Sequence, residues 1–180
     1  ESIEEIIELG KLKDEGKIKK IIATGCLAQR YKEEISQNLP EVDAVVGIGA
    51  NENIADIVEQ VLADEKVETF PDKLLLSLDG KRIQSTPQYY AYIKIAEGCS
   101  NCCTYCAIPM IRGKFRSRKM ENIITEATEL ANNGVKELIV IAQDTTKYGT
   151  DLYGEPSLAK LLKELCKIDG FKWIRVLYCY

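Results

Sequence analysis

The sequence has no histidine among its 180 residues. This absence excludes Ser-His and Cys-His catalytic pairs, histidine metal ligands and histidine proton shuttles. Chemistry that is too hard for the remaining side chains must therefore come from a cofactor. The sequence also lacks an apolar run long enough to cross a membrane as a helix.

No secretory signal is visible either, because the first residues, ESIEEIIELG, have the composition of an acidic amphipathic helix. With no signal and seven cysteines, the sequence predicts a protein of the reducing cytoplasm, where cysteines are more often ligands or catalysts than disulfides. The formal net charge of −4 argues against a generic nucleic-acid binder, since phosphate neutralisation needs many basic residues.

The two ends of the chain suggest that it is an internal piece of a longer protein. The chain does not begin with methionine, and its last residues, WIRVLYCY, are typical of a buried strand that stops abruptly.

Apolar runs alternate with helical patterns in the first part of the chain, which predicts an α/β layer domain with a mostly parallel sheet. We assign this domain to residues 1–66. Its expected elements are a helix over 2–14, a strand ending at Thr24, a turn at Gly25-Cys26, a helix over 29–38, a strand over 42–48 and a helix from an N-cap at Asn51 to about residue 63.

Residues 67–88 interrupt this rhythm with charges, prolines and an Asp79-Gly80 turn, so we expect a linker with a possible hairpin. A second β/α series fills residues 89–180. It consists of strands over 91–96, 137–142 and 173–178 and helices over 120–133 and 157–167. Three such steps fit the first half of a (β/α) barrel, in which chemistry sits at the C-terminal ends of the strands.

Three cysteines follow the first strand of that series, in the spacing Cys99-x3-Cys103-x2-Cys106. Cysteine thiolates are the usual ligands of iron–sulfur clusters, and a set of three leaves one iron of a cubane open to a substrate or cofactor. A structural zinc site is the alternative, but zinc prefers four closed ligands and no histidine can complete the set. We favour the iron–sulfur site over zinc and over buried free thiols.

The wider string IAEGCSNCCTYCAIPMIRGKFRSR resembles the methylthiotransferases of the radical S-adenosylmethionine (SAM) superfamily. Upstream, ATGCLAQRY is similar to their N-terminal domain. Downstream, VIAQDTTKYGTDLYG and IRVLYCY resemble the branch that modifies the small-subunit ribosomal protein numbered twelve. The resemblance covers nearly the whole chain.

This resemblance implies a role for each matching residue. Cys99, Cys103 and Cys106 would hold a 4Fe–4S cluster whose open iron chelates the amino and carboxylate groups of SAM. Tyr105 would lie near the adenine, and Gln143 would face the methionyl part of SAM.

The resemblance also implies a second, auxiliary 4Fe–4S cluster held by three cysteines of the N-terminal domain. Cys26, in the TGC motif, would be the last of these, and the other two would lie upstream of Glu1. Cys102 departs from the family pattern, because relatives commonly have a different, often basic, residue there. Cys102 could be an adventitious ligand or a residue without a role in the site, and we favour the second interpretation.

The implied reaction is radical chemistry. An electron from the reduced cluster cleaves SAM, the resulting 5′-deoxyadenosyl radical removes a hydrogen atom from the β-carbon of an aspartate, and sulfur and a methyl group are added. An electron donor such as flavodoxin or ferredoxin is implied as a partner. The main alternative is the sister branch that modifies an adenosine beside the tRNA anticodon, which typically has asparagine where Asp144 stands. A non-catalytic iron–sulfur or zinc module is the alternative from another class.

A run of basic residues follows the cysteine loop. It could bind RNA, neutralise the SAM carboxylate, meet an acidic protein substrate or form a solvated face, and the sequence does not choose among these. Its members are Arg112, Lys114, Arg116, Arg118 and Lys119.

Overall fold

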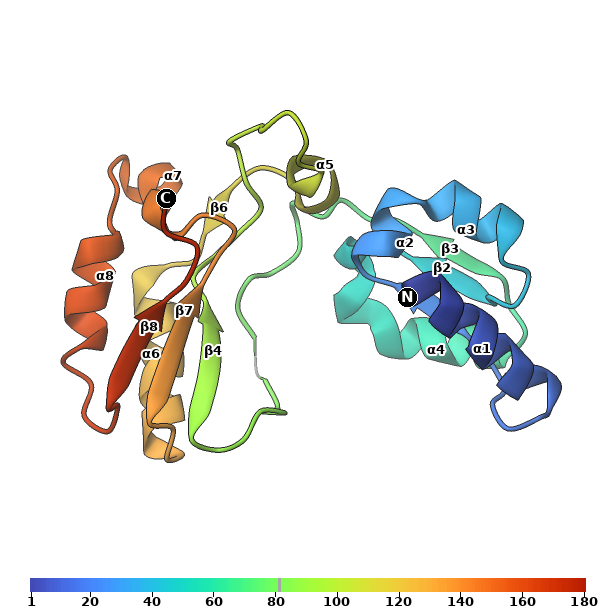
Figure 1. Cartoon of the computed structure of the whole chain (residues 1–180), viewed down its shortest axis with the longest axis horizontal. Helices are drawn as coiled ribbons and strands as arrows, with labels where there is room; N and C mark the ends of the chain where they lie inside the picture. The colour runs from blue at the N-terminus through green and yellow to red at the C-terminus, as the bar shows by residue number, and fades with distance from the viewer. Residues whose placement is uncertain (81) are drawn as a thin grey trace. The chain divides into compact units, whose positions relative to one another are not determined.

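A computed structural model describes residues 1–80 and 82–180 of the chain (Figure 1). The described residues fall into two compact units. The first comprises residues 1–76 and 110–112, and the second comprises residues 77–109 and 113–180. Both units are α/β structures with parallel sheets, which confirms the predicted fold class. None of the helices in these ranges has the length and hydrophobicity that a membrane crossing requires.

The sheet of the first unit has three parallel strands in the order β1-β2-β3. The strands are β1 (Ile22–Thr24), β2 (Ala44–Val46) and β3 (Val67–Thr69). The helical elements are α1 (Ser2–Asp14), α2 (Cys26–Arg30), α3 (Lys32–Asn38), the 3-10 helix η1 (Ile48–Asn53) and α4 (Ile54–Leu62).

The core of this first unit lies on both faces of the sheet, because successive side chains of a strand point to opposite sides. Ala44 and Val46 pack with Ile57 of α4, whereas Val45, between them, packs with Ile35 of α3. A three-residue strand therefore supplies both apolar layers.

Several elements of the first unit differ from the prediction. The expected helix over 29–38 is two helices that break at Tyr31, whose φ of −120° and ψ of 38° are not helical. Asn51 lies inside η1 and does not cap α4, which begins at Ile54. Residues 67–69, expected in the linker, form β3 instead, and its polar Glu68 and Thr69 hide it from a hydrophobicity pattern.

The sheet of the second unit is also parallel, in the order β4-β7-β8. The strands are β4 (Tyr90–Lys94), β7 (Glu137–Ile141) and β8 (Trp173–Val176). The two long helices α6 (Met120–Asn132) and α8 (Leu158–Leu165) follow β4 and β7 in the chain and share one apolar core with the sheet. This is the order of the first three steps of a β/α barrel.

Short elements connect these strands and helices, and the sequence predicted none of them. They are β5 (Ala96–Glu97), α5 (Ile108–Arg112), β6 (Arg116–Ser117), the 3-10 helix η2 (Thr145–Lys147) and α7 (Thr150–Tyr153). β5 and β6 pair antiparallel. Elements of two to five residues are too short to show a period.

The last strand, β8, also differs from the prediction. The apolar run before the C-terminus is typical of a buried strand, yet Trp173 is 70% exposed, because β8 pairs on one side only, with β7. The possible hairpin of residues 67–88 stays a prediction, since Lys81 lies outside the described residues. The described residues on either side of it, 70–80 and 82–89, contain no strand.

Candidate cofactor cavity

The cysteine loop and the Gln143-Asp144 pair meet at one end of the parallel sheet of the second unit. Lys94, the last residue of β4, is the register partner of Ile141, the last residue of β7. The carboxyl ends of neighbouring parallel strands therefore lie side by side, and the segments that follow them meet at the same edge.

A cavity of about 720 Å³ opens at this edge, a volume typical of small-molecule sites. Five of the six predicted site residues line it: Cys99, Cys103, Tyr105, Cys106 and Gln143. The rest of the lining consists of Lys94, Asn101, Ile108, Ile141, Ala142, Tyr178 and Tyr180.

Backbone hydrogen bonds and one buried carboxylate hold the cysteine loop in place. The Cys99 amide donates to the Gly113 carbonyl at 3.1 Å. The Asn101 side chain donates to Asp144 at 2.9 Å, which ties the loop to the end of β7. Gly98 starts the loop at a φ of +76°, where an added Cβ would lie 2.3 Å from the Lys114 carbonyl oxygen, so only glycine fits there.

Asp144 is a fixed anion at this edge. Burial raises its pKa, but hydrogen bonds from Thr146 and Asn101 outweigh that effect, and the pKa lies below the ordinary value of an aspartate. Because only 2% of Asp144 is exposed, its hydrogen bonds replace water almost completely.

The three thiols that line the cavity differ in exposure: Cys99 is buried, Cys106 is half-buried and Cys103 is exposed. In the described part of the chain, no three Cys, Asp or Glu side chains are gathered as a metal site. Three thiols around one cavity, in a chain without histidine, nevertheless match the donor set that an iron–sulfur cluster with an open iron requires. By the chemistry of its donors, the cavity fits that group.

A polar wall that the sequence did not indicate stands behind the cavity. Glu97 is 2% exposed. Its carboxylate forms an ion pair with Lys94 and accepts a hydrogen bond from Gln143 Nε2 at 3.2 Å. The other end of that amide, Gln143 Oε1, is buried without a hydrogen-bond partner among the described residues. A charged residue inside the apolar run IKIAEG is the signal that could have identified Glu97.

Tyr105 and Cys26 differ in position. The ring of Tyr105 is 95% exposed at the mouth of the cavity, so it is available to a planar ligand. Cys26 lies in the first unit, where it begins α2 directly after β1, and it is half-buried. Its neighbour Gly25 has a φ of +93°, which allows the sharp turn from strand to helix.

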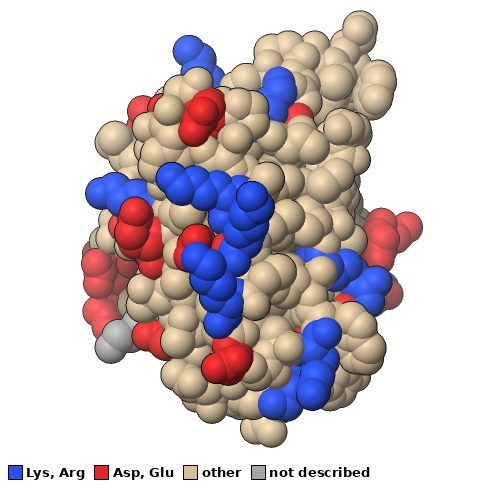
Figure 2. All heavy atoms as spheres, turned by 90° about the vertical axis from the view of Figure 1, so that its left-hand side faces the viewer, with Lys and Arg blue, Asp and Glu red and all other residues tan. Residues whose placement is uncertain are grey.

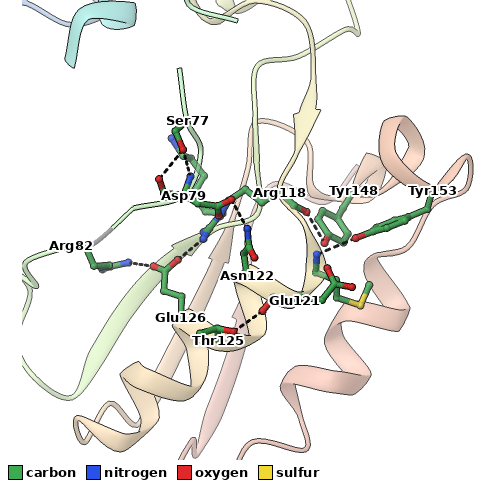
Figure 3. A network of polar contacts seen from close by, with 12 residues as sticks. Ser77, Asp79, Arg82, Arg118, Glu121, Asn122, Thr125, Glu126, Tyr148 and Tyr153 are labelled. Carbon is green, nitrogen blue, oxygen red and sulfur yellow. Dashed lines mark hydrogen bonds and ion pairs between the residues drawn. The ribbon is translucent and has the colours of Figure 1, made fainter. Parts of the chain in front are cut away.

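The basic run does not form one continuous face. Arg118 is only 6% exposed and pairs with Asp79 and Glu126, at 2.7 Å each, as Figure 3 shows. Arg82 pairs with Glu126 at 3.1 Å in the same network. Arg118 is therefore a structural residue, whereas Lys114 and Lys119 are exposed.

The surface that carries α8 is mixed in charge. Figure 2 shows a central column of Lys and Arg side chains on this face, with acidic side chains close to it. Opposite charges side by side weaken the long-range field that a polyanion would feel.

Two family models match the chain. Residues 93–179 match the Radical SAM superfamily, and residues 1–47 match a family described as Uncharacterized protein family UPF0004. Among curated relatives, the chain is 56% identical over 181 residues to "Ribosomal protein uS12 methylthiotransferase RimO" of Clostridioides difficile (strain 630). That alignment covers 100% of this chain and 41% of the relative.

Other relatives with the same name are equally similar. The protein of Thermoanaerobacter sp. (strain X514) is 56% identical, and that of Caldanaerobacter subterraneus subsp. tengcongensis is 58% identical, each over 181 residues. In both cases all of this chain and 41% of the relative are covered, so the chain spans about two fifths of the length of these relatives.

Proposed function

Since the chain belongs to the radical SAM methylthiotransferase family, we propose that the protein adds a methylthio group to the β-carbon of an aspartate in ribosomal protein uS12. The observation that carries the proposal is the single cavity lined by Cys99, Cys103 and Cys106 together with Tyr105 and Gln143. The name that these relatives share supports uS12 as the substrate.

Each lining residue has a chemical role in this proposal. The three thiolates hold a 4Fe–4S cluster, which when bound supplies the electron that cleaves SAM and so gives access to radical chemistry. The buried oxygen of Gln143 accepts a hydrogen bond from the methionyl part of SAM, and the ring of Tyr105 lies beside the adenine. Ile108, Ile141 and Ala142 form an apolar part of the cavity lining.

Cys26 is our candidate ligand of the auxiliary 4Fe–4S cluster. Its position in the turn after β1 supports this role, because a thiol at the end of a strand is presented to a ligand. We assign an electron donor such as flavodoxin or ferredoxin as a further partner. All seven cysteines are free, which supports a reducing compartment, and we propose the cytoplasm.

The tRNA-modifying branch is the second candidate function. Asp144 stands where that branch typically has asparagine, and the net charge of −4 does not favour a polyanion. Both features support the protein substrate.

Mass spectrometry after turnover tests the proposed substrate. We expect the full-length protein, reconstituted anaerobically with iron and sulfide, to add one methylthio group to a uS12 aspartate when SAM and a reductant are present. A uS12 variant with asparagine at the modified position is the control and should stay unmodified. Modification of tRNA nucleosides with none of uS12 would overturn the proposal in favour of the second candidate.

A further inference from the structure

Glu97 lies behind the cavity at the point where β5 ends and the cysteine loop begins. It is 2% exposed, and it is not among the described residues that line the cavity. A buried carboxylate is unfavourable unless it is paired and hydrogen-bonded. The hydrogen-bond and ion-pair partners of Glu97 therefore indicate its role in the structure.

Two of these groups are side chains of the cavity wall. Lys94 pairs with Glu97 Oε2, and Gln143 Nε2 donates to Glu97 Oε1 at 3.2 Å. The Gly98 amide also lies 3.3 Å from Glu97 Oε1, so the same carboxylate contacts the start of the cysteine loop. Lys94 and Gln143 belong to two different strand ends, β4 and the segment after β7, and Glu97 joins them.

The direction of the hydrogen bond from Gln143 determines what the cavity offers to a ligand. A carboxylate only accepts hydrogen bonds, so it selects the NH2 end of the Gln143 amide. The oxygen end is then left as an acceptor, and it is buried without a partner among the described residues. An unsatisfied buried acceptor costs free energy until a donor reaches it.

From this geometry we infer that Glu97 is a positioning residue, which orients Gln143 so that its Oε1 accepts a hydrogen bond from the amino group of the amino-acid part of the ligand. This inference rests on the proposed function, which supplies SAM as the ligand. An amino group retains N–H donors whether or not it also coordinates a metal.

Binding of two non-reacting nucleosides to the reconstituted full-length protein tests the inference by calorimetry. S-adenosylhomocysteine carries the amino-acid part, and 5′-methylthioadenosine lacks it. We expect Glu97→Gln to weaken binding of S-adenosylhomocysteine about tenfold, the scale of one hydrogen bond, and to leave 5′-methylthioadenosine unchanged. Glu137→Gln, at the other end of β7 and paired with Arg175, should change neither affinity.

A double-mutant cycle separates positioning from a direct effect. Gln143→Met should weaken S-adenosylhomocysteine binding to a similar degree, and adding Glu97→Gln to it should cause no further loss. Equal affinities of Glu97→Gln and the unchanged protein for both nucleosides would overturn the inference. So would an equal loss for both, because that is the result of a merely structural role. If the unchanged protein bound neither nucleoside, the proposed function itself would fail.

Discussion

At the scale of single residues, position separates the four cysteines between residues 99 and 106. Cys99, Cys103 and Cys106 line the cavity, whereas Cys102 is not among the described lining residues and has a φ of +50°. Their place around the cavity therefore makes Cys99, Cys103 and Cys106 the candidate ligands.

Substituting adjacent cysteines tests this distinction. We predict that Cys103→Ala removes the iron and acid-labile sulfide of one 4Fe–4S cluster after reconstitution of the full-length protein and leaves those of the auxiliary cluster, because two thiolates do not retain the cubane. Cys102→Ala, the matched control, should keep the iron content of the unchanged protein. Iron loss in Cys102→Ala with retention in Cys103→Ala would reverse the assignment.

The low pKa of Asp144 makes the stability of the fold depend on pH. Its pKa is lower in the folded state than in the unfolded chain, so the carboxylate stabilises the fold at neutral pH, and this contribution is lost as pH falls through the folded-state pKa. We predict that Asp144→Asn lowers the free energy of unfolding by about 2 kcal/mol at pH 7, and that the difference shrinks below about pH 4.

Chemical denaturation at several pH values measures this effect. Asp169→Asn, at an exposed position, serves as the control and should change the free energy by less than about 0.5 kcal/mol. A difference for Asp144→Asn that stayed constant down to pH 3 would show that its charge does not carry the effect.

At the scale of elements, Arg118 joins three parts of the second unit. Its guanidinium pairs with Asp79, before β4, and with Glu126 of α6 (Figure 3). It also donates a hydrogen bond to the Lys94 carbonyl at the end of β4. Asn122 of α6 donates to Asp79 at 2.7 Å, which adds a second tie to the same segment.

Removing this arginine should be costly, because Asp79 and Glu126 lose their buried cationic partner and keep, among the described residues, only the side-chain contacts with Asn122 and Arg82. We predict that Arg118→Ala lowers the free energy of unfolding by about 3 kcal/mol. The neighbouring Lys119→Ala, at an exposed position, should change it by less than about 0.5 kcal/mol. Equal values for the two variants in urea denaturation would contradict a structural role for Arg118.

The long elements could be predicted from the sequence and the short ones could not. α1 and α6 have many residues at helical spacing, and β7 is an uninterrupted apolar run whose centre is buried, so pattern alone finds them. β5 and β6 have two residues each and are fixed by pairing across the loop, a contact that is invisible in one dimension. β3 was missed for a similar reason, since its pairing with β2 and not its composition makes it a strand.

The same limit applies to the candidate site. The spacing of the cysteines identified the loop, and the family resemblance implied Gln143 as a further site residue, which lines the same cavity. The hydrogen bond from Asn101 to Asp144 joins residues 43 positions apart, and the one from Gln143 to Glu97 joins residues 46 positions apart. Both depend on side-chain packing between distant segments. No local pattern encodes such contacts. The domain bounds at residues 66 and 89 stay predictions.

At the scale of the whole molecule, each unit has its own apolar core. Val46 is fully buried in the first unit and Val140 in the second, and no cluster of the described buried residues contains both. Trp173 in β8, the sole tryptophan of the sequence, reports on the second unit alone.

Separate cores predict separate responses to core substitutions. We expect Val140→Ala to lower the free energy of unfolding, as measured by tryptophan fluorescence, by about 2 kcal/mol. Val46→Ala should leave the fluorescence transition unchanged. It should move only the part of the far-ultraviolet circular dichroism transition that comes from the first unit to a lower denaturant concentration. Equal shifts of the fluorescence transition by both variants would mean that the two units unfold as one.

The central claim is that the cavity binds a cluster with an open iron that SAM reaches. The most direct measurement is electron paramagnetic resonance of the full-length protein, reconstituted anaerobically, reduced, and recorded with and without SAM. The account predicts a reduced 4Fe–4S signal that changes when SAM is added. Absence of the cluster, or a signal indifferent to SAM, would contradict it and favour a structural metal module.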